Sequence, residues 1–524
     1  MTMSSRHILA AAAILAAAIA ASVLLQDLER AVVFTAIDDG PYYQIVAENL
    51  VRTGRLTYDG VSITNGFQPL FMAMMVPIYW LTGDPWTALK LVYCLIAVLS
   101  VVSCLLFGGI SKRLGLTLSG FSIGFLILFA NLRSFTLLFS LLETPLLLLA
   151  CLAYLAYALR VGEKRYTQAR EAFVCGLLIG LAFLARTDSS LLAAGYGVIL
   201  LHRTARGRQK IRASARAGAA AAAGSLLLAG PYLLANALAF GHLVPVSGYR
   251  KMSVVTDWRI LFQPLASVYD YLIPRLALVL GLPEKYHTAL LFVILACLAA
   301  GCGILLTTTV RKRMGELFAL LSDFFVFAAL HFVVIYLFAT EQVLVAAWYH
   351  VSELVAIALM VAFMMPRAKA FDRATVGLVA AALVAQSLLY PGFVERKTMT
   401  WAKLEAATYI REKLPQDARL AMVDSGITAY FGRRHFVGLN GVIGDYAMAD
   451  LIKAGRWREV AERCGIEYLV LDVDPGLAGD LPGEEVFRGS VGTRYADFAE
   501  GEKVFFIFRV DPADLETIWR MRFG

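Results

Sequence analysis

Two adjacent carboxylates, Asp38 and Asp39, follow the first apolar run of the sequence and precede Gly40 and Pro41. Because proline is favoured in the first turn of a helix, we expect a helix to begin here, capped by Asp39 or Gly40. The positive end of that helix would stabilise both carboxylates as anions. Such a pair suits a general base whose neighbour binds a substrate hydroxyl or a cation. Ordinary capping by surface aspartates explains the same residues, and both interpretations are open at this point.

The residues after Pro41 form two faces at helical spacing. One face holds Tyr42, Ile45, Val46, Asn49 and Leu50, and the other holds Gln44, Glu48 and Arg52. This amphipathic pattern is typical of a helix that lies in the plane of a membrane surface. We therefore expect the acidic pair at the level of the lipid headgroups.

Further charged residues lie at or near the ends of apolar runs, where a charge is costly. Glu143, Arg186 and Asp188 are of this kind. They could bind a ligand, form a structural ion pair, or be helix ends whose side chains reach water. Arg250 and Lys251 stand in a loop rich in tyrosine and tryptophan. That pair suits either a phosphate clamp or contact with anionic headgroups.

Aromatic and imidazole side chains form another group of candidates. Tyr349 and His350, with Glu353 one turn later, could touch a ligand at the membrane surface or belong to an aromatic belt. His331 lies within an apolar run, and we expect it to form a hydrogen bond between helices. Zinc is not predicted, because no two histidines stand four residues apart.

The composition indicates a membrane protein with many spans. Of 524 residues, 59% are apolar and only 17% are charged, whereas soluble domains carry about 25% charged residues. Twelve candidate spans are visible, at 8–25, 67–82, 86–110, 117–133, 140–158, 172–187, 188–203, 217–239, 287–309, 317–340, 343–365 and 374–391. The first is either a signal peptide or, as we favour, an uncleaved span. The net charge of +8 does not indicate a nucleic-acid partner, because the basic residues cluster in links between apolar runs.

Those basic links predict the topology. They lie at 112–113, 160–170, 203–216, 311–313 and 367–373, and should face the cytoplasm. With the N-terminus inside, an odd number of crossings must precede Lys112, so one of the runs 67–82 and 86–110 does not cross. We expect this to be 67–82, which is short and contains two prolines, leaving eleven crossings. Loops 26–66 and 241–286 and everything after residue 391 then share the outer face. A cytoplasmic turn at 83–86, with Lys112 outside, is the alternative.

Residues 392–524 have the pattern of a small α/β domain that follows a membrane module of residues 1–391. Strand-like runs at 419–423, 468–471 and 504–510 alternate with helix-like runs at 400–413, 445–454 and 457–464. Polar residues at 424–426 and 438–441 are interpreted as turns, although ligands also favour that edge of a sheet. The alanine run at 217–223 indicates tight helix packing. Walker, dinucleotide-binding and Gly-x-Ser-x-Gly patterns are missing from the sequence, so nucleotide-driven transport and Rossmann redox chemistry gain no support.

Several motifs, taken in order, resemble those of a known superfamily. Asp38-Asp39 with Tyr42-Tyr43, followed by Thr-Asn-Gly-Phe-Gln-Pro-Leu at 64–70, is similar to the first external loop of GT-C glycosyltransferases, which use polyprenyl-phosphate sugars. Segments 142–146, 184–188 and 241–251 with Asn236 resemble motifs of bacterial members akin to arabinofuranosyltransferases; protein mannosyltransferases are also similar. The sequence departs from these motifs at Leu142, where glycine is usual, at Gly40-Pro41, and at Thr187 in place of proline.

The resemblance implies a polytopic helical membrane protein of the GT-C type with a small C-terminal α/β domain. One of Asp38 and Asp39 would be the base that deprotonates an acceptor hydroxyl, and we favour Asp38. Substrate binding is implied for Tyr43, Asn65, Gln68, Glu143, Arg186, Asp188, Arg250, Lys251, Tyr349 and His350. The sequence leaves metal dependence open, since Asp38 or Asp39 could hold Mg²⁺ or Mn²⁺.

The implied partners are a polyprenyl-phosphate-linked sugar donor, a glycan, lipid or protein acceptor of the cell envelope, and membrane lipids. The implied location is a bacterial inner membrane, with the active site and C-terminal domain on the extracytoplasmic side. The rival interpretation is a transporter or flippase of lipid-linked saccharides, whose charged groups would line a pathway near mid-membrane. This sequence instead groups its carboxylates and large loops on one face.

Overall fold

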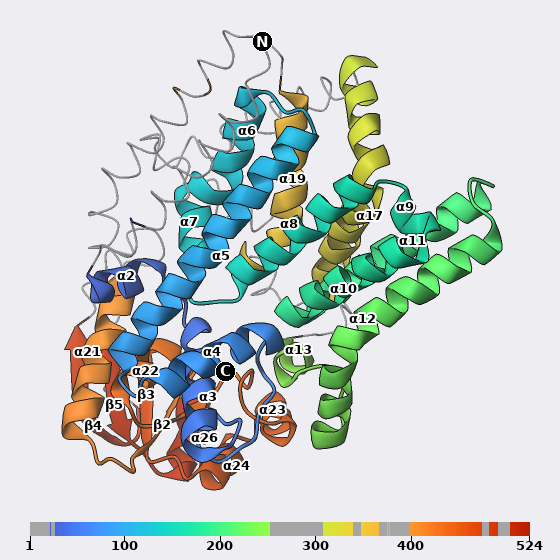
Figure 1. Ribbon diagram of the computed structural model, residues 1–524. Helices are drawn as coiled ribbons and strands as arrows, with labels where there is room; N and C mark the ends of the chain where they lie inside the picture. The colour runs from blue at the N-terminus through green and yellow to red at the C-terminus, as the bar shows by residue number, and fades with distance from the viewer. Residues whose placement is uncertain are drawn as a thin grey trace, which may run out of the picture.

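The computed structural model describes residues 27–251, 308–338, 347–365, 398–473, 481–490 and 504–523, and residues 21, 375 and 377 singly. It consists of a set of long helices and, at one end of them, a small domain built on a β-sheet (Figure 1). The predicted spans at 8–25, 287–309 and 374–391 and loop residues 252–286 lie wholly or almost wholly outside the described residues.

Four helices of the described chain are long and apolar enough to cross a membrane. They are α5 (Pro85–Arg113), α8 (Thr144–Val161), α12 (Ile211–Phe240) and α17 (Thr308–Phe338). The start of α5 is set by Asp84, whose carboxylate accepts a hydrogen bond from the Thr87 amide at 2.7 Å, and by Pro85 in the first turn. Its end carries Lys112 and Arg113, which favour a helix C-terminus. The protein is therefore an integral membrane protein, and the count of eleven spans stays a prediction.

The run at 67–82 forms the short helix α4 (Pro69–Leu81), which packs against α3 (Gly40–Thr53). Its 13 residues extend about 20 Å, less than the roughly 30 Å of a hydrocarbon core. The 29 residues of α5 exceed that thickness. These lengths favour the expectation that 67–82 does not cross.

One predicted span is divided in the structure, and two neighbouring ones are separate helices. The run 117–133 becomes α6 (Leu118–Phe125) and a π-helical turn, η1 (Leu126–Ala130), before α7 (Leu132–Leu138). The runs 172–187 and 188–203, predicted as separate spans, form α10 (Ala169–Ala185) and α11 (Leu191–Ala205). The 3₁₀ turn η2 (Thr187–Ser190) joins them, and the short α9 (Lys164–Thr167) precedes them. The charged residues Arg186 and Asp188 therefore lie at a break between helices.

Small residues let α10 and α12 approach closely. A Cβ atom on Gly176 would lie 2.0 Å from the backbone oxygen of Ala221, and one on Gly224 would lie 2.2 Å from that of Phe173. Such close approach is typical of helix pairs in membranes. The tight packing predicted for the alanine run at 217–223 is thus confirmed.

The first loop holds α2 (Leu28–Thr35) and α3, which begins at Gly40 as predicted. Asp39 occupies the N-cap position, but its side chain forms no capping hydrogen bond. The polar face of α3 is covered at Gln44 and Glu48 but exposed at Arg52, and its position in a membrane interface stays a prediction. Gln44 is fully buried, and Glu48 forms an ion pair with Arg433, at 2.6 Å and 2.5 Å for the two oxygens. The covering element is α22 (Gly426–Gly432) of the C-terminal domain.

The C-terminal domain contains a five-stranded sheet in the order β2-β1-β3-β5-β4. Strands β1 (Arg419–Met422), β2 (His435–Gly438) and β3 (Tyr468–Val473) are parallel, and β5 (Val504–Arg509) and β4 (Glu484–Ser490) continue the sheet antiparallel. The helices are α21 (Thr398–Lys413), α22, α23 (Tyr446–Lys453), α24 (Trp457–Cys464) and α26 (Pro512–Phe523). The predicted strands and helices are confirmed. Strand β4 was missed because its sequence is mostly polar, and α22 because it is short.

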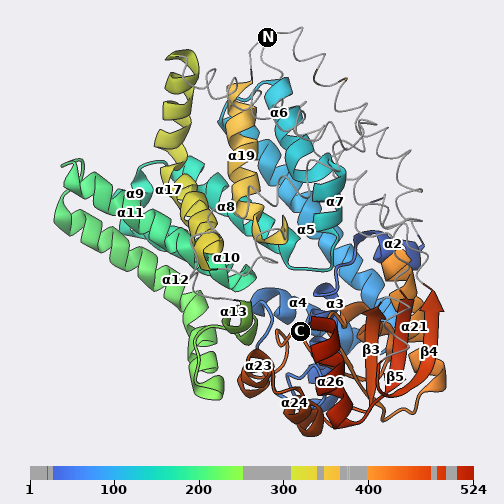
Figure 2. The same cartoon turned by 180° about the vertical axis from the view of Figure 1, so that it is seen from behind.

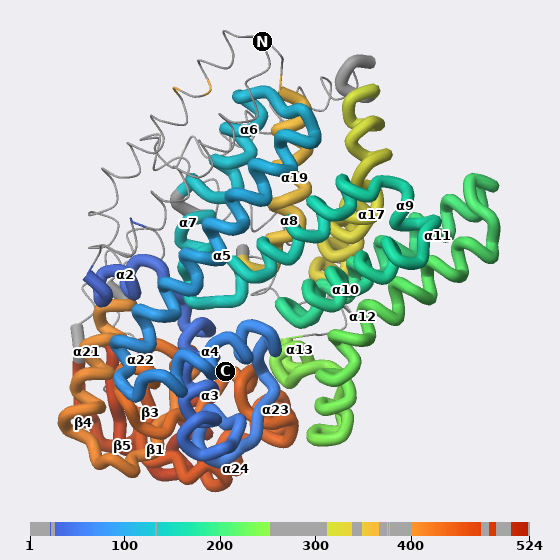
Figure 3. Tube along the Cα trace, in the orientation of Figure 1, coloured from blue at the N-terminus to red at the C-terminus, as the bar shows by residue number. Residues whose placement is uncertain are grey.

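The first loop and the C-terminal domain lie side by side although they are far apart in sequence. From both sides, α3 and α4 lie against the sheet domain (Figures 1 and 2), and the tube view shows the blue first loop among the orange and red segments (Figure 3). Helices α13 (Val246–Lys251), η6 (Ala347–Tyr349) and α19 (Val351–Met364) complete the surroundings of the site.

Candidate active site

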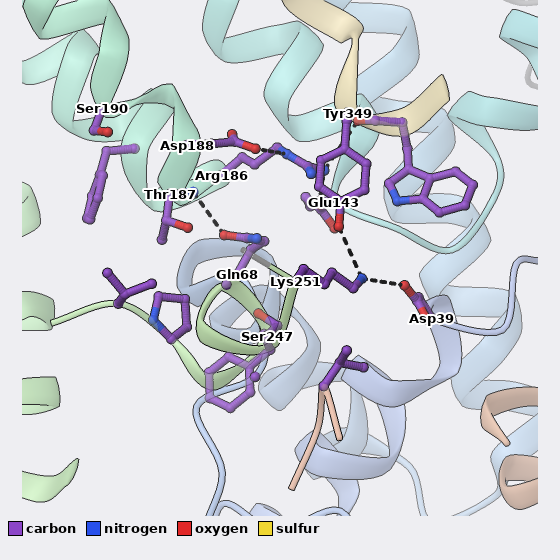
Figure 4. A pocket seen from close by; sticks show the side chains of 18 of the residues that line it. Asp39, Gln68, Glu143, Arg186, Thr187, Asp188, Ser190, Ser247, Lys251 and Tyr349 are labelled. Carbon is purple, nitrogen blue, oxygen red and sulfur yellow. Dashed lines mark hydrogen bonds and ion pairs between the residues drawn. The ribbon is translucent and has the colours of Figure 1, made fainter. Parts of the chain in front are cut away.

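A cavity of about 390 Å³ lies where the first loop, the break between α10 and α11, and α13 meet. Its lining is mixed. The charged and hydrogen-bonding residues among it are Asp39, Tyr43, Gln68, Glu143, Arg186, Asp188, Lys251 and Tyr349. Asp39, Glu143, Lys251 and Tyr349 gather at one end, called the polar end below (Figure 4). The apolar residues of the lining include Phe183, Leu191, Leu233, Leu243, Val334 and Ile335.

Asp39 and Lys251 face each other across the polar end. The Lys251 ammonium lies 3.2 Å from Asp39 Oδ2 and donates a hydrogen bond to the Tyr349 hydroxyl at 3.1 Å. Burial would lower the pKa of Lys251, but the Asp39 carboxylate and Tyr349 outweigh it and raise the pKa above its usual value. Lys251 is therefore a cation at neutral pH.

Arg186 is held by two carboxylates at the same end. Its guanidinium lies 2.6 Å from Glu143 Oε1 and 2.9 Å from Asp188 Oδ2, and packs 4.1 Å from the centre of the Tyr349 ring. The side chains of Arg186 and Glu143 are only 3% and 4% exposed. Tyr43 donates a hydrogen bond to Glu143 Oε2 at 2.6 Å. This network fixes Arg186, since a buried charge must be paired.

The network continues away from the cavity through a histidine. Nε2 of His331 lies 3.6 Å from Asp188 Oδ2, and Nδ1 lies 2.7 Å from Glu353 Oε1. His331 stands on α17 and Glu353 on α19, so the predicted interhelical contact of His331 is confirmed. Gln68 lies on the other side of the break, where its side-chain oxygen accepts a hydrogen bond from the Thr187 amide at 2.9 Å.

Three of the expected binding residues lie elsewhere than on this cavity. Asn65 donates to Asn236 at 3.3 Å and accepts from the Val246 amide at 3.0 Å, so it joins the first loop to α13. Arg250 packs against Gly441 of the C-terminal domain rather than beside Lys251. His350 is not among the lining residues, and lies 4.0 Å from Glu353.

Asp38 also points away from the cavity, toward the C-terminal domain. The Lys403 ammonium lies 2.5 Å from Asp38 Oδ2 and also donates to the backbone oxygen of Asp424 at 3.1 Å. Burial would lower the pKa of Lys403, but Asp38 outweighs it and raises the pKa. No sequence pattern singled out Lys403, which is one lysine on an ordinary helix.

Turn residues of the C-terminal domain also contact the first loop. The Asn440 amide donates to the Tyr42 hydroxyl at 3.2 Å, and the hydroxyls of Ser425 and Tyr58 lie 2.7 Å apart. These residues follow β2 and β1. The interpretation of segments 424–426 and 438–441 as plain turns is therefore incomplete, because both contact the first loop.

A divalent cation would find few protein ligands here. Within the described residues, no group of three or more His, Cys, Asp or Glu side chains is placed to hold a metal ion. Asp38 and Asp39 point to different lysines, so of these two only Asp39 could offer a ligand to a cation in the cavity.

The comparisons with known proteins concern the C-terminal domain and the whole chain. Residues 393–508 match a family described as "Domain of unknown function (DUF8728)". A comparison with curated proteins found no match.

Among solved structures, ArnT from Cupriavidus metallidurans bound to undecaprenyl phosphate is similar with a TM-score of 0.53 and 12% identity, covering 94% of this chain and 97% of ArnT. AglB from Archaeoglobus fulgidus, in complex with an inhibitory peptide and a dolichol-phosphate, matches at a TM-score of 0.47 and 13% identity, covering 98% of this chain and 77% of AglB. The similarity to ArnT extends over almost the whole of both chains. The chain therefore has the same fold as ArnT.

Proposed function

We propose that this protein transfers a sugar from a polyprenyl-phosphate donor to a hydroxyl of a glycan, lipid or protein acceptor of the cell envelope. The observation that carries the proposal is the cavity itself, in which a carboxylate and two cationic side chains lie within a lining that is also rich in apolar side chains. The GT-C fold supports the same class of reaction.

The polar and the apolar residues of the cavity lining match the two parts of such a donor. The apolar side chains from α10, α11, α12 and α17 suit a polyprenyl chain that enters from the membrane. Lys251 and Arg186 suit the phosphate, and the sugar would then lie next to Asp39. Arg186 is already paired with two carboxylates, so Lys251 is the cation that we expect to take up most of the phosphate charge.

The proposed reaction is one displacement at the anomeric carbon. Asp39 accepts the proton of the acceptor hydroxyl while the acceptor oxygen forms a bond to the anomeric carbon. The bond between that carbon and the phosphate oxygen breaks, and its electron pair leaves with the polyprenyl phosphate. Lys251 offsets the additional negative charge on this leaving group. Asp39 replaces Asp38 as the proposed base because only Asp39 lines the cavity.

The proposed location is a bacterial inner membrane with this cavity on the extracytoplasmic side. The basic residues at the end of α5 and in the link between α11 and α12 support this orientation, because such residues favour the cytoplasm. Cell-envelope acceptors and polyprenyl-linked donors would then meet on the outer face, where a polyprenyl phosphate presents its headgroup.

The test is mass spectrometry of envelope glycans and lipid-linked sugars from cells with and without the protein. A transferase predicts loss of one sugar from an acceptor and accumulation of its polyprenyl-phosphate form on the outer leaflet. Complementation with Asp39→Asn should leave both changes in place, whereas wild type should reverse them. A lipid-linked sugar that accumulates on the inner leaflet, and full complementation by Asp39→Asn, would instead indicate a flippase.

A further inference from the structure

The carboxyl ends of parallel strands are where α/β sheets bind ligands, and in this domain that edge is covered by the chain's own first loop. The segments after β1 and β2 carry Ser425 and Asn440, whose side chains contact Tyr58 and Tyr42. The domain thus holds the loop in the place where related sheets hold a small molecule. Its position suggests a role in arranging the site.

The tightest contact of this interface is made by the residue next to Asp39. The backbone oxygen of Asp38 lies so near Gly426 that a Cβ atom there would be 1.7 Å from it. The Asp38 side chain pairs with Lys403 at 2.5 Å, and its second oxygen lies 3.4 Å from the Ile427 amide. Both the backbone and the side chain of Asp38 are therefore fixed by the domain.

The burial of Lys403 is explained by its ion pair with Asp38. Its side chain is 8% exposed, and lysine is almost never buried unless it is paired. A buried ion pair adds little net stability compared with apolar side chains of the same shape. What the pair does provide is a fixed distance between α21 and the first loop.

We propose that Lys403 is a positioning residue, and that its ion pair with Asp38 locks the first loop so that Asp39 faces the cavity. The proposal rests on the proposed transferase function, since it names what aligns the base. Asp38 and Asp39 share one planar peptide unit, so a backbone rotation at Asp38 also turns Asp39. A misplacement of about 1 Å can cost about a hundredfold in rate.

The test compares Lys403→Met, Lys403→Arg and Asp38→Asn with wild type in lipid nanodiscs. Lys413→Met is the matched control, because Lys413 is exposed on the same helix. We expect Lys403→Met to lower kcat about ten- to a hundredfold with the donor KM nearly unchanged, and Lys403→Arg to restore part of the rate. Asp38→Asn combined with Lys403→Met should cost no more than either change alone, because both remove one interaction.

Hydrogen–deuterium exchange of the peptide that spans residues 36–43 gives a readout independent of activity. Exchange there should rise in Lys403→Met and Asp38→Asn, and stay at the wild-type level in Lys413→Met, while β1 and α21 remain protected. Wild-type kcat and exchange in Lys403→Met would overturn the proposal, and so would faster exchange throughout the domain, which would indicate a merely structural role. If wild type transfers no sugar, the proposed function fails, and the exchange of this peptide alone decides whether the lock exists.

Discussion

At the scale of single residues, the two aspartates of the first loop have different surroundings. Asp39 lines the cavity and pairs with Lys251, whereas Asp38 pairs with Lys403 of the sheet domain. Adjacent side chains that point in opposite directions can divide two tasks between them. Asp39 is then available for a proton, and Asp38 for attachment of the loop.

Lys251 and Arg250 are neighbours in sequence, but substituting each with glutamine should affect the transfer rate differently. Lys251→Gln removes a charge from the cavity, and loss of a charge-assisted contact typically costs about 1.5–3 kcal/mol, or roughly ten- to a hundredfold in rate. Arg250→Gln should keep the wild-type rate, because Arg250 packs against Gly441 outside the cavity. The measurement is the transfer rate of both variants at equal protein amounts in reconstituted membranes. Equal losses in the two would mean that they act together on the phosphate or on headgroups.

Residue types and order were sufficient to predict much of this site, but not the directions of its side chains. Glu143, Arg186 and Asp188 were predicted from the cost of charge near apolar runs, and they do meet. The choice of Asp38 over Asp39 and the grouping of Arg250 with Lys251 could not be decided, because a sequence does not say which way neighbours point. Lys403 was missed because its partner is 365 residues away in the chain.

At the scale of elements, close helix packing beside the cavity depends on glycine. Gly224 and Gly230 stand on the same helix, but only Gly224 lacks room for a side chain. Gly224→Ala should destabilise the protein by about 1–3 kcal/mol, as overpacking does. Gly230→Ala meets nothing within 4 Å and should be neutral or stabilising by up to about 1 kcal/mol. Thermal unfolding in detergent compares the two, and similar melting temperatures would contradict the close approach of α10 and α12.

Elements with a strong local pattern were predicted well, and those that depend on distant contacts were not. The start of α3 was predicted from Pro41, and β1 and β3 from their apolar runs. The burial of Gln44 on α3 was not, because an amphipathic pattern predicts a polar face but not what covers it.

At the scale of the whole molecule, the C-terminal domain and the basic links should lie on opposite sides of the membrane. Ala454 is exposed at the end of α23, and Arg208 is exposed in the link between α11 and α12. An impermeant thiol reagent should label Ala454→Cys in intact cells, and Arg208→Cys only after lysis. A cysteine-free background removes any reaction of the natural thiols. The reverse pattern would invert the orientation and the face of the cavity with it.

The central claim is that Asp39 is the base of a sugar transfer from a polyprenyl phosphate. The most direct measurement is the single-turnover transfer rate of the purified protein in lipid, with the donor that accumulates in cells lacking it. Asp39→Asn should lower this rate by about a hundred- to ten-thousandfold, with expression and melting temperature near those of wild type, and Asp38→Asn should lower it less. A wild-type rate in Asp39→Asn would contradict the account and would favour a carrier of lipid-linked saccharides.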